Sequence, residues 1–92
     1  MDTKRVDVNG NNICLDDIVV VGSYDGNSVG YYDVGIVSYT ALDCSFYIKC
    51  KYVNLDFTPF THIKIIDRMC NHRNKNEQEV LELYQEEWKK YE

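Results

Sequence analysis

The residue types best suited to chemistry in this chain are four cysteines and two histidines. Cys70 and His72 are close enough in sequence to bind one zinc ion together, with Cys44 and Cys50 as further ligands. Zinc sites usually pair their ligands about two to four residues apart, and Cys44 and Cys50 are spaced too widely. A Cys70 nucleophile with His62 or His72 as its base lacks a surrounding catalytic motif. We therefore expect no metal, no other cofactor and no enzymatic activity.

The cysteines also bear on the compartment in which the chain works. Residues 1–7 contain no apolar stretch of the kind that directs export. The longest aliphatic run, Ile18 to Val21, is far shorter than a membrane span of about 20 residues. The sequence thus predicts a cytoplasmic location, where thiols stay reduced. We expect four free and mostly buried thiols: Cys14, Cys44, Cys50 and Cys70.

A second kind of chemistry is phosphate binding. Four basic side chains alternate along two expected strands: Lys49, Lys51, Lys64 and Arg68. If those strands pair as neighbours, the four gather with Tyr47 into one basic face, and Tyr31 or Tyr32 from a nearby loop can stack on a base. The net charge of −5 favours a plain solvated sheet face instead, and we expect no binding to duplex DNA.

Several short strands must position these side chains. Asn9-Gly10 predicts a turn with a positive φ angle. The expected strands cover residues 13–21, ending at Gly22, then 34–40 and 45–53 as a hairpin, and 62–70. Within 45–53, one face is expected to carry Phe46, Ile48, Cys50 and Tyr52, and the other Tyr47, Lys49 and Lys51. Residues 22–35 are expected to form a long, flexible connection of the kind that often binds ligands.

The chain then changes character. Residues 1–75 contain nine acidic residues, all Asp, and eight Lys and Arg, whereas residues 76–92 contain six Glu and two Lys. Asp favours turns and Glu favours helices, so the segregation predicts a loop-rich body over 1–75 and a helix over 76–92. The strand pattern makes the body a small β-domain. Strands without βαβ alternation indicate an all-β class with one terminal helix, built as a small, strongly bent antiparallel sheet or barrel.

The expected helix is amphipathic. Asn76 with Glu79 three residues later predicts a reciprocal N-terminal cap. An apolar seam recurs at helical spacing: Leu81, Tyr84, Trp88 and Tyr91. The helix either closes its own domain or docks on another chain, including a second copy. In the docking case the partner-binding residues are Tyr84, Glu86, Glu87, Trp88 and Tyr91.

Three segments in order resemble the phage and prophage YopX-like proteins over residues 5 to about 75. The segment 7–13 followed by Asp17-Ile18-Val19 resembles the D-x-N-G-x-x-I turn and G-D-I-V strand of that family. Gly35-Ile36-Val37 and then Phe46 resemble its central G-V-V strand and aromatic residue. Residues 63–67, with the Asn-containing tail, resemble its closing V-x-V-I-G segment.

The resemblance implies a small SH3-like β-barrel without an established enzymatic activity. Asp16 and Asp67 stand where the family has glycine, and the helix lies outside the resemblance. We expect a phage-encoded protein that acts in the host cytoplasm by binding and inhibiting a host protein, such as a defence nuclease. Two alternatives stay open: a sponge for a signalling nucleotide and an accessory protein that binds single-stranded nucleic acid.

Overall fold

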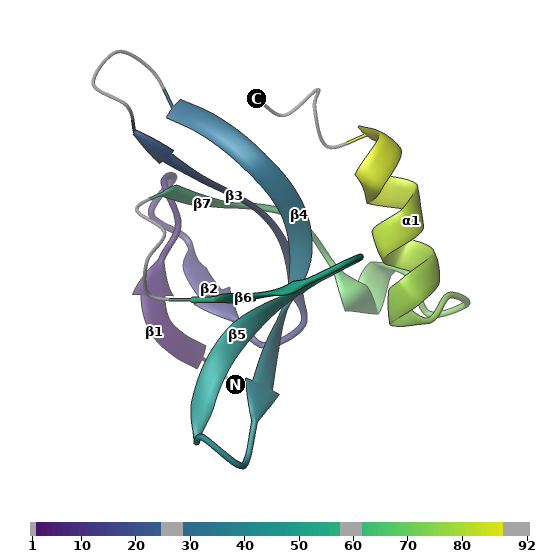
Figure 1. The fold of residues 1–92 in the computed structure, drawn as a ribbon, viewed down its shortest axis with the longest axis horizontal. Helices are drawn as coiled ribbons and strands as arrows, with labels where there is room; N and C mark the ends of the chain where they lie inside the picture. Colours follow the sequence, from purple (N-terminus) through teal and green to yellow (C-terminus); the bar gives the residue numbers. More distant parts are fainter. Residues whose placement is uncertain (1, 25–28, 58–61, 88–92) are drawn as a thin grey trace.

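The computed structural model describes residues 2–24, 29–57 and 62–87, which form mostly antiparallel β-structure followed by one helix (Figure 1). The elements are β1 (Asp2–Val6), β2 (Asn12–Cys14), β3 (Asp17–Tyr24), β4 (Val29–Thr40), β5 (Ser45–Cys50), β6 (Asn54–Asp56), β7 (His62–Arg68), a 3₁₀ turn (Met69–Asn71) and α1 (Glu77–Glu87). A five-stranded sheet has the order β6-β5-β4-β3-β7, and β1 pairs with β2. The predicted class, β-structure with one terminal helix, is confirmed.

The interior strand β3, which lies between β4 and β7, is apolar on both faces of the sheet. Ile18, Val19, Val20 and Val21 are all fully buried, and neighbouring side chains of a strand point to opposite faces. Val19 and Val21 pack in one core, while Ile18 and Val20 pack in another. Figure 1 shows why both faces are covered, because β1 and β2 lie on one side of the curved sheet and α1 on the other.

Each face therefore has its own hydrophobic core. The core on the β1–β2 side contains Ile13, Val19, Val21, Val37, Ile48, Cys50, Phe57 and Ile63. The core on the helix side contains Ile18, Val20, Val34, Ile36, Val80, Leu81 and Tyr84. Residues of the described part of α1 thus pack against the sheet of their own domain, as expected of a helix that covers it.

The predicted N-terminal cap of the helix is confirmed. The backbone N–H of Glu79 donates to Asn76 Oδ1 at 2.9 Å, and the backbone N–H of Asn76 donates to Glu79 Oε1 at 3.4 Å. These bonds satisfy donors that the first helical turn leaves without intrahelical acceptors.

In the described ranges, no helix is long and apolar enough to span a membrane.

Around β3, the strand and loop boundaries predicted from the sequence are wrong. The expected strand over 13–21 is divided into β2 and β3 by a turn in which Asp16 has a φ of 70°. The expected loop over 22–35 is mostly strand, because β3 runs to Tyr24, β4 begins at Val29, and the two pair along this whole length. Gly22, Gly30 and Gly35 all take part in the ladder, and a bulge between Val21 and Gly22 absorbs its irregularity.

The predicted hairpin of β4 and β5 is confirmed, with Thr40 opposite Ser45. The strand that follows its turn ends at Cys50 rather than at 53, so Tyr52 is 79 % exposed instead of lying on the apolar face. The last strand ends at Arg68, two residues earlier than predicted, where the chain enters the 3₁₀ turn.

Candidate functional site

The strands that carry the predicted basic face are not neighbours. Lys49 lies on β5 and Lys64 on β7, and both β4 and β3 lie between them in the sheet. Lys51 follows the end of β5, and Arg68 is the last residue of β7. These strands do not pair with each other, so the condition under which the four side chains would gather into one face is not met.

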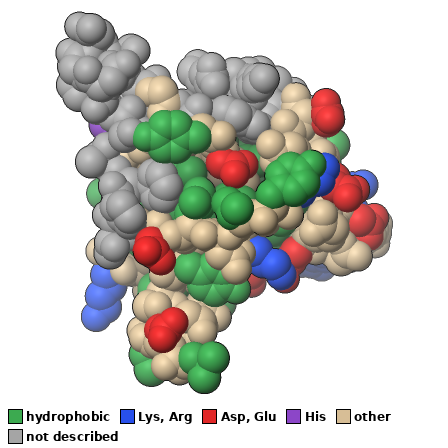
Figure 2. Space-filling model, in the orientation of Figure 1, with side chains coloured by type: hydrophobic (Ala, Val, Ile, Leu, Met, Phe, Trp, Pro, Cys, Tyr) green, Lys and Arg blue, Asp and Glu red, His purple; other side chains and the backbone are tan. Residues whose placement is uncertain are grey.

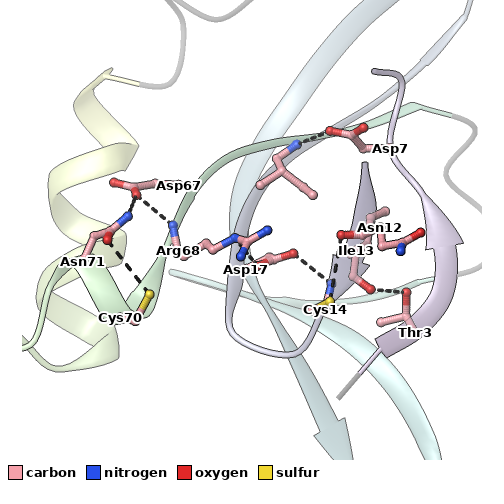
Figure 3. A network of polar contacts seen from close by, with 11 residues as sticks. Thr3, Asp7, Asn12, Ile13, Cys14, Asp17, Asp67, Arg68, Cys70 and Asn71 are labelled. Carbon is pink, nitrogen blue, oxygen red and sulfur yellow. Dashed lines mark hydrogen bonds and ion pairs between the residues drawn. The ribbon is translucent and has the colours of Figure 1, made fainter. Parts of the chain in front are cut away.

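Two of the basic side chains face carboxylates of the same chain. Arg68 Nε lies 3.4 Å from Oδ1 of the buried Asp17, whose Oδ2 accepts the backbone N–H of Cys14 at 2.8 Å (Figure 3). Lys49 Nζ lies 3.7 Å from Glu77 Oε1 at the start of α1, and both side chains are partly exposed. The exposed pair of Lys49 and Glu77 contributes little stability. Both cations nevertheless lie next to acidic groups of their own chain.

The tyrosines proposed for the basic face and for base stacking lie on different strands. Tyr47 lies on β5, and Tyr32 lies on β4 with 55 % exposure. Tyr31 belongs to β4, but its side chain lies outside the described part of the structure. Lys51 Nζ lies 5.2 Å from the centre of the Tyr52 ring, within cation–π range. Phosphate or nucleotide binding by these residues stays a prediction.

The partner-binding residues proposed on the helix differ in exposure, and some lie outside the described residues. Tyr84 is only 7 % exposed and packs in the core on the helix side. Glu86 is exposed. The side chain of Glu87 lies outside the described residues, as do Trp88 and Tyr91. Partner binding through this end of the helix stays a prediction.

Tyr84 belongs to a polar cluster where β7, the 3₁₀ turn and α1 meet. The carboxylate of Asp67 is at its centre, and its Oδ2 accepts the Tyr84 hydroxyl and lies 2.8 Å from His72 Nε2. Its Oδ1 accepts Asn71 Nδ2 at 2.7 Å and the backbone N–H of Arg68 at 2.8 Å (Figure 3). One carboxylate therefore ties the helix and the 3₁₀ turn to the last strand.

This arrangement lowers the pKa of the Asp67 carboxyl group. Burial alone would raise the pKa of Asp67, but the hydrogen bonds from Tyr84, Asn71 and the other two donors hold the pKa well below its usual range. The group is ionised at neutral pH. Its contacts explain how the helix is attached to β7.

A second carboxylate anchors the turn between β1 and β2. Asp7 is 5 % exposed, and its Oδ1 accepts the backbone N–H groups of Asn9 and Asn11, each at 2.9 Å. Its Oδ2 accepts the backbone N–H of Ile65 on β7 at 3.1 Å (Figure 3). The predicted turn is confirmed, with φ of 83° at Gly10. Because β7 is an edge strand, Asp7 occupies a donor that a foreign strand could otherwise pair with.

The expectation of mostly buried thiols is wrong. Cys50 is buried, Cys14 is half-buried, and Cys44 and Cys70 are exposed. The exposed pair lies in a hairpin turn and in the 3₁₀ turn, where few apolar groups cover them. Burial, with the neighbouring Asp33 carboxylate, raises the pKa of Cys50 to about 12. Within the described ranges, no three His, Cys, Asp or Glu side chains are grouped to hold a metal ion.

The most unusual exposed residue lies at the end of the β4–β5 hairpin. This hairpin projects from the body of the molecule (Figure 1), and Leu42 in its turn is 96 % exposed. Tyr39 on the same hairpin is 39 % exposed. In the same orientation, Figure 2 shows hydrophobic and acidic side chains together at the hairpin end. Hairpin turns usually contain Gly, Asn or Asp, so an exposed leucine has no evident role in the fold.

A shallow hollow of about 330 Å³ lies beside this turn. Two exposed carboxylates line it, Asp43 from the turn and Asp56 from β6. Tyr47 lies directly opposite Asp56 across the β5–β6 ladder, and Thr40 with Ser45 completes the polar lining near the turn. Of the described residues that line the hollow, none is basic.

Sequence reasoning missed this surface. The turn at 41–44 was predicted, but Leu42 was not recognised as an exposed residue. A leucine in a turn was the signal that could have identified it, because turns usually contain small or polar residues. Asp56 gave no signal, because its strand was not predicted. No family model, curated protein or solved structure matches the chain.

Proposed function

We propose that this chain is a non-enzymatic, phage-encoded binding protein that engages a basic host protein, such as a defence nuclease, and inhibits it. The observation that carries the proposal is Leu42, 96 % exposed at the end of a projecting hairpin. Removing one leucine side chain from water on binding contributes about 1.5–3 kcal/mol. An apolar side chain that projects from the turn of a β-hairpin is suited to insertion into an apolar pocket of a partner protein.

Charge supports a basic partner. The chain carries a net charge of −5. Asp43 directly follows the exposed leucine and lines a hollow together with Asp56. Complementary charge accelerates association and disfavours like-charged partners. A nuclease that holds nucleic acid in a basic channel offers such complementarity, and an acidic protein seated there excludes the substrate.

The family resemblance supports the phage origin, and we propose that the curved sheet with β1 and β2 forms an SH3-like barrel. The two departures from the family pattern have local counterparts in the structure. Asp16 has a φ of 70°, a conformation that glycine adopts without cost. Asp67 binds Tyr84 of the helix, an element outside the resemblance, so an aspartate there serves this chain's own helix.

The test is affinity capture from bacterial host lysate with the tagged full chain. Retained proteins and co-purified small molecules are both identified by mass spectrometry. We expect one basic protein at a stoichiometric level, released by raised salt because exposed charge contacts are screened. The purified protein, if it is a nuclease, should lose activity when the chain is added.

A nucleotide present at one per chain, with no protein retained, would replace this proposal by the nucleotide-sponge alternative. Retention of single-stranded nucleic acid that carries the protein with it would favour the accessory-protein alternative. Nuclease treatment of the lysate separates that case, because a direct protein complex survives the treatment.

A further inference from the structure

We infer that the hollow beside Leu42 receives an arginine or lysine side chain of the partner, which makes the hairpin end the docking surface. This inference rests on the proposed function and names the chemistry of its contact. The surface is defined by Leu42, Asp43, Tyr47 and Asp56, which come from the hairpin turn, β5 and β6.

Charge is the first argument for this occupant. Asp43 and Asp56 are both exposed and line the same hollow, whose described lining contains no cation. The nearest basic residue in an adjoining hollow is Lys49, and Glu77 faces it at 3.7 Å. A cation entering from a partner therefore finds two carboxylates and meets no competing positive charge among the described residues that line this hollow.

Shape and polarity are the second argument. Tyr47 lies directly opposite Asp56 and lines both hollows, so a tyrosine side chain borders the place where the cation enters. A guanidinium can pair with a carboxylate and stack on an aromatic ring, which suits arginine in particular. The hollow is open and small, so it fits one side chain rather than a folded segment.

Leu42 is the third argument, because it supplies an apolar contact next to the charged one. A cation bound only by exposed carboxylates gains little in water. A leucine that is buried against the partner excludes water from the rim and strengthens the neighbouring ion pairs. Among the described surfaces, the hairpin end combines a nearly fully exposed leucine with a carboxylate-lined hollow.

The test uses a defined probe and does not need the host protein. The full chain is titrated by NMR with a short synthetic peptide containing one arginine between two leucines, and then with the same peptide containing uncharged citrulline. We expect backbone amide shifts at residues 41–47 and 54–56 with the arginine peptide. The citrulline peptide should bind at least about tenfold more weakly, because the charge contacts are lost.

Two double variants locate the effect. Asp43→Asn with Asp56→Asn should weaken the arginine peptide by about tenfold or more. Glu82→Gln with Glu86→Gln removes the same charge from exposed positions of α1 and should leave the affinity unchanged. Amide spectra of both variants check that the fold is intact.

Equal binding of the two peptides, equal loss in both variants, or shifts confined to other residues would overturn the inference. So would shifts at 41–47 and 54–56 on titration with an oligothymidine, since the surface would then accept an anion. Capture of a host protein is a separate result. A negative peptide titration would refute this contact while the captured complex stands, and a failed capture would leave a positive titration in place.

Discussion

At the scale of single residues, one buried and one partly buried aspartate attach the separate parts of this fold to one another. Asp7 links the β1–β2 turn to β7, and Asp67 links α1 to β7. The sequence predicted the first role in part, because Asp7 precedes a recognisable Asn-Gly turn. It could not predict the second, because His72 and Tyr84 reach Asp67 only after the 3₁₀ turn redirects the chain.

We expect Asp67→Asn to destabilise the fold by about 1–3 kcal/mol, because the amide cannot accept all the hydrogen bonds that the carboxylate accepts. The loss is measured by urea unfolding at neutral pH. Asp56→Asn is the matched control, since Asp56 is exposed and its substitution should change the free energy of unfolding by less than about 0.5 kcal/mol. Equal stability of the two variants would refute the role of Asp67.

The pH dependence of stability should also depend on the Asp67 carboxylate. The folded pKa of Asp67 is lowered relative to the unfolded value of about 4, so its stabilisation is fully present above that value. It is lost as the pH falls from about 4 toward the folded pKa, where both states become protonated. Between pH 6 and 2, the wild type should therefore lose more stability than Asp67→Asn. Parallel curves for the two proteins would contradict the assignment.

The thiols should differ in reactivity. Because Cys50 is buried and its pKa is raised to about 12, little thiolate forms at pH 8. We expect an alkylating reagent to modify the exposed Cys44 and Cys70 rapidly in the folded protein, and Cys50 only after denaturation. Peptide mapping after a short pulse measures this order. Early modification of Cys50 would show that its surroundings are open.

At the scale of elements, the β4–β5 hairpin and the capped helix were predictable because their signals are local. The length of the β3–β4 hairpin was not, since the glycines and turn residues of 22–35 suggest a loop. Pairing with β7 and β5 holds the base of this hairpin, over residues 17–22 and 35–40. Toward its turn, the described residues are held in strand conformation by the pairing of β3 with β4. Local propensity yields to such tertiary pairing.

Gly35 should be essential to the contact between β4 and β5. A Cβ atom at this position would lie 2.4 Å from Ile48 Cγ2 and 2.9 Å from Cys50 Sγ. We expect Gly35→Ala to cost about 1–3 kcal/mol of stability, because both neighbours are buried and must shift. Gly30→Ala, in the same strand with no atom within 4 Å of the new Cβ, is the control. Thermal unfolding that leaves the two variants alike would contradict the close packing.

At the scale of the whole molecule, one sheet separates two cores. The run Ile18 to Val21 contained this information, because continuous apolar residues indicate a strand buried on both faces. The order of the strands could not be predicted, since β7 returns beside β3 from a distant part of the chain. Whether the basic residues form one face depends on that order. The hollow beside the hairpin turn depends on the position of β6, which supplies part of its lining.

The helix-side core should depend on α1. Leu81 is 1 % exposed in that core, and Leu81→Ala should lower the free energy of unfolding by about 2–5 kcal/mol. Leu83 is on the same helix and is 37 % exposed, so Leu83→Ala should change it by less than about 0.5 kcal/mol. Equal effects in chemical denaturation would mean that the helix does not cover the sheet in solution.

We propose that this chain works by binding a protein through the end of the β4–β5 hairpin. The most direct measurement compares host-lysate capture by the wild type, Leu42→Asn and Tyr52→Asn, each first shown to unfold at the same temperature. Tyr52 is a matched control, because it is 79 % exposed just beyond the other end of β5. We predict that the wild type and Tyr52→Asn retain the same basic protein and that Leu42→Asn loses it. Undiminished retention by Leu42→Asn would contradict the claim.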